Sequence, residues 1–203
     1  ALIDTTEDAN EIFALSWAAI SRDLGAHAVH LRKMRADAVA LPLITRAHAT
    51  LTARDDAPYL DLASAPGFAA YEERYTAKAR KNRRRLARRL AALGPVNTQT
   101  LGGGAAARTA ALEAITLKRR SLEATGRVSP ALDDPRFAAF FADAAEGRDH
   151  PCGCRVTRML VGERLAASTI DITGNGTCAA HLIVHEPEFD ARGAGTLMTE
   201  QWI

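Results

Sequence analysis

The sequence is poor in cysteine, in aromatic residues and in long apolar runs. It has three cysteines and 5% aromatic residues among 203 residues. No run of about 18 apolar residues occurs, so the sequence predicts no membrane-spanning helix, and no charged-then-apolar signal segment is present. The odd cysteine count, with Cys152 and Cys154 separated by one residue, excludes an ordinary disulfide framework, and a single Cys-x-Cys supplies too few zinc ligands. We therefore expect free thiols, no metal site and a cytoplasmic protein.

The sequence also lacks an excess of either charge, because the formal net charge is only +2. Overall charge therefore predicts no particular partner, and any basic surface must be local. With 47% hydrophobic residues, the chain can bury the core of one large domain or of one and a half. The chain starts at Ala1 rather than Met and stops at Ile203 within an expected helix, so we expect a piece of a longer protein.

The first third of the chain predicts a helix over residues 7–24, from apolar residues at helical intervals. Alternating residues over His27–Met34 predict a half-buried strand, and residues 59–62 predict a short one. Ser64, as an N-cap, is expected to begin one long helix that ends at about Leu93.

From residue 95 onward the pattern changes to short strands and amphipathic helices. A helix is expected to begin at Pro135 and to turn Phe137, Phe140 and Phe141 inward. A Gly-Glu turn at residues 162–163 and an Asn-Gly turn at residues 175–176 predict hairpins. The expected elements are a strand over residues 95–101, helices over 105–125 and from 135, strands over 153–161, 164–173 and 178–185, and a helix from Gly193.

The connection between the last strand and the last helix is rich in small residues: Gly193-Ala194-Gly195-Thr196. The N–H groups in the first turn of a helix have no partner within the helix, and together with the helix dipole they bind anions. Small residues let a phosphate approach this backbone closely. A Gly-rich connection is by itself also compatible with an ordinary turn.

The run Pro187-Glu188-Phe189, three residues, Gly193-Ala194-Gly195 and then Thr196 resembles the pyrophosphate loop of the GNAT superfamily of acyl-CoA-dependent acyltransferases. Asp190 departs from that pattern, which usually has Gln or Arg there. The order of elements from residue 95 also resembles the GNAT fold. The resemblance implies an α/β (α+β) fold with a mixed, mainly antiparallel sheet flanked by helices, and acetyl-CoA or another acyl-CoA as cofactor. It implies the cofactor-binding residues Ile183, Val184, Arg192, Gly193, Ala194, Gly195 and Thr196.

Residues 59–93, with Tyr59-Leu60-Asp61-Leu62 and a basic run over residues 78–86, resemble the cellulose-biosynthesis (CelD-type) branch, which is related to the Fem-type transferases. That resemblance implies two GNAT-like halves. Residues 1–60 would then be the end of a first half with a connection, and residues 61–203 an acyl-CoA-binding domain. The closing strand, helix and hairpin of the family do not follow Ile203, so we expect a truncated domain.

Eight of the twelve residues from Lys78 to Arg89 are Lys or Arg. This basic helix is either a solvated face or an anion site, for CoA phosphates or for a polyanionic acceptor. A nucleic-acid surface is the weaker interpretation, because interleaved aromatic residues are missing.

Catalysis in this fold needs a base. The position where the family often has a Glu is Ala179 here, and His181 lies two residues further along the same strand, so we expect them to share a face. A neutral imidazole suits proton transfer near neutral pH, and His181 is our catalytic candidate, the alternative being a core or surface histidine. His185 is expected on the same face. No Ser or Cys pairs with a His in a nucleophile pattern.

These features predict an N- or O-acyltransferase that passes the acyl group directly from acyl-CoA to an amine or hydroxyl. The acceptor is a small molecule or saccharide, and the CelD-type resemblance implies polysaccharide or envelope biosynthesis. Two alternatives stay open. One is a Fem-like transferase that uses aminoacyl-tRNA, and the other is a GNAT-like module that binds a partner without catalysis.

Overall fold

The computed structural model divides the chain into two compact units, Ala1–Asp61 and Leu62–Ile203. In the first unit, α1 (Ala9–Leu24) confirms the helix expected over residues 7–24, and α2 spans Leu41–Arg46. The strand expected at residues 27–34 lies outside the described residues, as does the one expected at 59–62 apart from Asp61, which is not assigned to a strand. The structure describes residues 9–24, 38, 41–46, 50, 61, 64, 67–148, 152–174 and 176–201.

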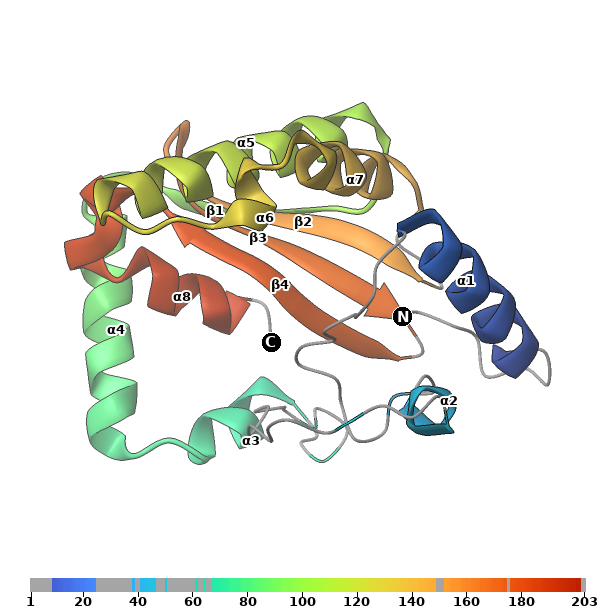
Figure 1. Ribbon diagram of the computed structural model, residues 1–203. Helices are drawn as coiled ribbons and strands as arrows, with labels where there is room; N and C mark the ends of the chain where they lie inside the picture. Colours follow the sequence, from blue (N-terminus) through green and yellow to red (C-terminus); the bar gives the residue numbers. More distant parts are fainter. Residues whose placement is uncertain are drawn as a thin grey trace. The chain divides into compact units, whose positions relative to one another are not determined.

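The second unit is built on one four-stranded sheet with the order β1-β2-β3-β4 (Figure 1). Every neighbouring pair is antiparallel. The β2–β3 hairpin turns at Gly162, whose φ of 62° is one that glycine adopts without strain. This mixed α/β arrangement, with helices flanking an antiparallel sheet, confirms the predicted fold class. The strands are β1 (Val96–Leu101), β2 (Gly153–Val161), β3 (Arg164–Gly174) and β4 (Thr177–His185).

One face of the sheet is covered by α5 (Gly104–Ala124) and α7 (Pro135–Glu146), which lie side by side, with the short α6 (Pro130–Asp133) before α7 (Figure 1). Asp134 caps α7 by accepting a hydrogen bond from the Arg136 N–H at 2.9 Å, as expected of an N-cap. A stripe of alanines, each at most 2% exposed, lets α5 pack closely on its neighbours: Ala107, Ala110, Ala111 and Ala114.

Phe140 does not point inward as predicted, because 62% of its surface is exposed, whereas Phe141 is 3% exposed. Residues four apart lie only about 40° apart around a helix, so Phe137, Phe141 and Ala145 form the packed side of α7. Phe140 is one residue away from that side and lies edge-on to Phe141 with ring centroids 5.0 Å apart.

A second core lies between the sheet and α4 (Ala77–Ala91), a 3-10 turn η1 (Pro187–Arg192) and α8 (Ala194–Gln201). Phe189 and Met198, both 0% exposed, are at its centre. This core fixes the start of α8 against the end of β4, the position where sequence patterns placed the anion-binding loop.

The single long helix predicted up to Leu93 is wrong, because it is two helices, α3 (Phe68–Glu73) and α4. Thr76 interrupts it with an extended backbone, and its hydroxyl caps α4 by accepting from the Ala79 N–H at 3.2 Å. Ser64 is not the N-cap of α3, which begins after Gly67 without a side-chain cap. The Ser64 hydroxyl instead accepts a hydrogen bond from Arg74 at 2.8 Å.

Candidate active site

The loop between β4 and α8 turns sharply at Gly193, whose backbone is left-handed with φ 77° and ψ 29°. The Gly193 N–H donates to the Asp190 carbonyl at 2.8 Å, and its own carbonyl accepts from the Leu197 N–H at 2.9 Å. The N–H groups of the next three residues, 194–196, form the first turn of α8 and have no partner within the helix. Ala194 is fully buried, whereas Thr196 is exposed, so the turn opens to solvent at Thr196.

The protein's own packing also favours both glycines of the loop. A Cβ on Gly193 would lie 2.7 Å from a methyl carbon of Leu86 on α4, and a Cβ on Gly195 would lie 2.9 Å from His185 Nδ1. A larger residue at either position would therefore force the Leu86 or His185 side chain to shift. The sequence explained the small size of these residues by phosphate access alone, and the structure adds packing as a second reason.

The acidic departure Asp190 is paired inside the loop. Its carboxylate lies 3.1 Å from His185 Nε2, on the imidazole whose Nδ1 faces Gly195. The carboxylate charge is therefore directed at an imidazole rather than left isolated. Arg192 is half-buried at the end of η1, next to Gly193.

The end of β4 carries Ile183 and Val184, and β4 is an edge strand among the described residues. Val184 is 3% exposed and packs into the core under α5 and α7. The Ile183 carbonyl accepts a hydrogen bond from the Lys118 ammonium of α5 at 3.1 Å. This cation at the strand edge was not found by sequence reasoning, because Lys118 lies 65 residues away along the chain.

His181 sits at an irregularity of β4. Ile170 pairs with Leu182 but Asp171 pairs with Ala180, so His181 is the extra residue of a bulge, and a bulge re-aims the side chain it contains. The exposed imidazole stacks on Phe141 of α7 with ring centroids 4.7 Å apart.

The prediction that His181 and His185 share a face is wrong. His181 contacts α7 on one side of the sheet, whereas His185 faces Gly195 of α8 on the other. The bulge breaks the two-residue alternation on which that prediction rested.

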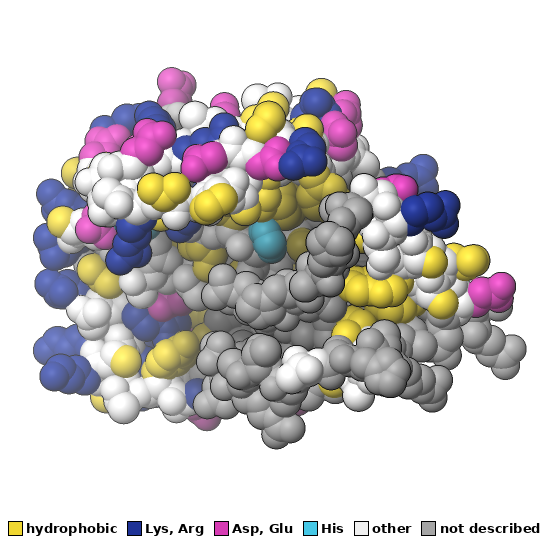
Figure 2. All heavy atoms as spheres, in the orientation of Figure 1, with side chains coloured by type: hydrophobic (Ala, Val, Ile, Leu, Met, Phe, Trp, Pro, Cys, Tyr) yellow, Lys and Arg dark blue, Asp and Glu magenta, His cyan; other side chains and the backbone are white. Residues whose placement is uncertain are grey.

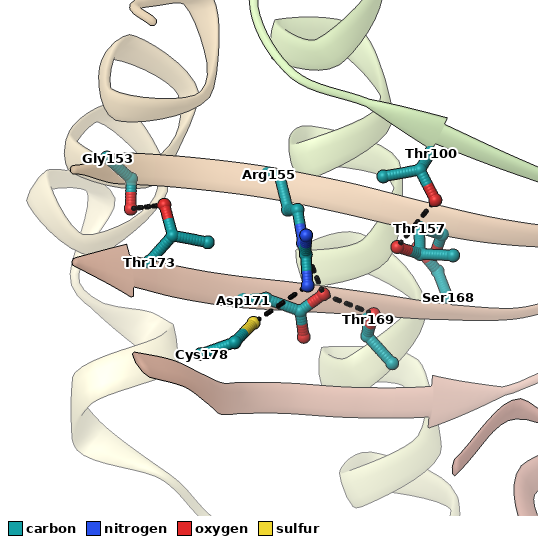
Figure 3. A network of polar contacts seen from close by, with 9 residues as sticks. All are labelled: Thr100, Gly153, Arg155, Thr157, Ser168, Thr169, Asp171, Thr173 and Cys178. Carbon is teal, nitrogen blue, oxygen red and sulfur yellow. Dashed lines mark hydrogen bonds and ion pairs between the residues drawn. The ribbon is translucent and has the colours of Figure 1, made fainter. Parts of the chain in front are cut away.

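A buried polar network that the sequence analysis missed lies beside this bulge (Figure 3). Asp171 is 0% exposed, and its carboxylate accepts from the Thr169 hydroxyl at 3.1 Å and lies 3.8 Å from Arg155 Nε. Arg155 also donates to Cys178 Sγ at 2.9 Å. Three neighbouring strands thus contribute one ion pair and one thiol. The available signal was a charged residue between two isoleucines in a strand.

Burial separates the basic helix α4 into two faces. Arg83 is only 7% exposed. Its guanidinium lies over the Tyr75 ring, 4.2 Å from the centroid, and forms an ion pair with Glu200 of α8. Burial raises the pKa of Glu200 despite this pairing, and burial together with the Tyr75 hydroxyl raises the pKa of Tyr71 to about 12. Arg83 is therefore a core residue and not part of the basic surface.

No group of three or more His, Cys, Asp or Glu side chains that could hold a metal ion occurs among the described residues. Within the same residues, no helix combines the length and apolar character needed to cross a membrane. The three cysteines are free, and burial raises the pKa of the Cys154 thiol to about 11, which keeps it neutral and unreactive.

Residues 77–203 match the family described as acetyltransferase (GNAT) domain. The match covers more than half of the chain and begins at the first residue of α4. The chain therefore belongs to the GNAT acetyltransferase family, whose members are acyltransferases. Comparisons with curated proteins and with solved structures returned no match.

Proposed function

We propose that this chain transfers an acyl group from an acyl-CoA, with acetyl-CoA as the first donor to test, to an amine or hydroxyl acceptor. The observation that carries the proposal is the left-handed turn at Gly193, which directs the open first turn of α8 to solvent at the end of an edge strand. The resemblance of residues 59–93 to the CelD-type branch favours a saccharide or envelope precursor as the acceptor.

The loop residues suit the pyrophosphate of the donor. The backbone N–H groups of Gly195 and Thr196 would donate to phosphate oxygens, assisted by the helix dipole, while the fully buried Ala194 packs beneath them. The half-buried Arg192 adds a cation next to the turn, and the pairing of Asp190 with His185 limits the repulsion that a free carboxylate would cause. The edge of β4 at Ile183 and Val184 would run beside the pantetheine arm.

His181 is the proposed general base. Its imidazole is on the α7 side of the sheet, so the acceptor would approach β4 from that side, while the pyrophosphate would lie at the start of α8. An exposed imidazole at a bulge can accept the proton that leaves an acceptor ammonium or hydroxyl. The acyl group then passes directly to the acceptor in a ternary complex, and CoA leaves as the thiol.

Calorimetry with acetyl-CoA, followed by thiol-release assays with amine and saccharide acceptors, tests the proposal. Binding and acceptor-dependent thiol release are expected. Binding of acetyl-CoA without thiol release with any acceptor would favour a binding module. Absence of acetyl-CoA binding would refute the cofactor assignment.

A further inference from the structure

The outer face of α4 carries a group of cations distinct from the loop at Gly193. Figure 2 shows Lys and Arg side chains gathered along α4, at the left of the view. α4 contains no acidic residue. A pocket of about 400 Å³ opens on this face, and among the described residues it is lined by α4 alone: Ala77, Arg80, Lys81, Arg84 and Arg88.

Within the part of the chain that the structure describes, the charges in this pocket are largely uncompensated. Arg80 donates to the carbonyls of Glu72 and Tyr75, at 3.3 and 3.1 Å, which fixes the guanidinium without neutralising it. The nearest carboxylate contact is between Glu72 and Arg84, at a long 3.9 Å. Arg80, Arg84 and Arg88 are four residues apart in turn, and like charges at this spacing destabilise a helix. A bound anion would relieve this repulsion.

The pocket and the loop at Gly193 lie on different sides of α4. Leu86, which touches Gly193, is two residues from both Arg84 and Arg88, so it points about 160° away from them around the helix. An anion held by Arg84 and Arg88 therefore does not occupy the first turn of α8.

We propose that this pocket binds an organic polyphosphate of nucleotide size. Three of its four cations are arginines, whose planar forks bind phosphate through paired hydrogen bonds. The lining extends from Ala77 to Arg88, about 16 Å of helix, and the volume falls within the range of small-molecule pockets. No aromatic side chain belongs to the described lining, so phosphates rather than a stacked base are recognised.

The test is calorimetry with inorganic tripolyphosphate at physiological salt, on the parent and on two charge-matched variants. The first variant combines Lys81→Gln, Arg84→Gln and Arg88→Gln, and it spares Arg80 because that side chain also holds the turn before α4. Since hydrogen bonds to charged groups are strong and this variant removes three cations, it should bind about 100-fold more weakly or worse. Tripolyphosphate should also raise the unfolding midpoint of the parent.

The second variant combines Lys78→Gln, Arg85→Gln and Arg89→Gln, and it removes the same charge from the flank of α4. Its dissociation constant for tripolyphosphate should stay within about threefold of the parent's, because the charge-assisted contacts in the pocket remain. Equal losses in both variants would show a diffuse basic surface and overturn the proposal.

Four other outcomes would also overturn it. Undetectable tripolyphosphate binding by the parent would show a solvated face. Tight binding of a short DNA duplex without tripolyphosphate binding would show a nucleic-acid surface. Equal binding of citrate would show no phosphate selectivity. Loss of tripolyphosphate binding in Thr196→Glu would place the anion at α8 instead.

Discussion

Replacing Thr196 by Glu separates anion binding from folding at the start of α8, because the two effects have opposite signs. Thr196 is exposed in the first turn of the helix. A carboxylate there interacts favourably with the helix dipole, by about 0.3–1 kcal/mol. The free energy of unfolding should therefore stay the same or rise slightly.

The same carboxylate should weaken acetyl-CoA binding, because it would compete with the pyrophosphate for the N–H groups of that turn. Two unit charges 4 Å apart repel by about 1 kcal/mol in water and by about 4 kcal/mol near a protein surface. The dissociation constant for acetyl-CoA should thus increase about tenfold or more. Calorimetry measures the affinity and urea unfolding measures the stability of the same samples.

Thr199→Glu is the matched control, since Thr199 is exposed on α8 one turn further along the helix. It should change acetyl-CoA affinity far less than Thr196→Glu does. Unchanged affinity in Thr196→Glu would refute the assignment of the pyrophosphate to this turn. Equal losses in both variants would indicate a general charge effect. Gly195→Glu is unsuitable here, because its Cβ would meet His185.

Four further outcomes follow from the contacts described above. Gly193→Ala should destabilise the fold in urea by about 1–2 kcal/mol for the left-handed backbone, and by a further amount for the clash of the new Cβ with Leu86. Adding Leu86→Ala to this variant should remove only the cost of the clash. If the free energies of unfolding lost in the two single variants simply add in the double variant, the contact is contradicted. Tyr71, with its pKa raised to about 12, should titrate above the range of exposed tyrosines in an alkaline absorbance titration. Its contribution to stability should be lost as the pH rises above about 10. If the three tyrosines titrate together, this prediction is contradicted. Burial raises the pKa of Glu200, so the folded chain binds this proton more tightly than the unfolded chain, and the free energy of unfolding falls as the pH rises above 4.5. Relative to the parent, Glu200→Gln should therefore gain stability as the pH rises above 4.5, and a difference that does not change with pH would refute the shift. His181→Ala should lower kcat about 100-fold with little change in acetyl-CoA affinity, and an unchanged kcat would end its role as base.

Sequence patterns predicted those features that depend on local periodicity and turn chemistry. The strand–turn–strand pattern at Gly162, the helix start at Pro135 and the connection at Gly193 are each encoded within a few residues, so they could be identified without tertiary information. The GNAT resemblance rested on the same local signals, and the family match over residues 77–203 confirms it. The CelD-type branch, the division at residue 60 and the site residues stay predictions.

The features that the sequence did not reveal depend on partners far along the chain. Arg83 is indistinguishable by type from Arg84, yet only Arg83 meets Glu200 of α8 and the Tyr75 ring. Its burial was therefore decided by the packing of α8 on α4.

The bulge at His181 likewise arises from the register between β3 and β4, which no spacing within β4 specifies. Asp171 became part of a network because β2 brings Arg155 to it. The sequence by itself determined the loop at Gly193 and the order of the strands and main helices from residue 95 onward, since local hydrogen bonds and hydrophobic periodicity suffice for them. Only the tertiary structure decided which charges are buried and which way His181 points, because burial and strand register arise from contacts between distant segments.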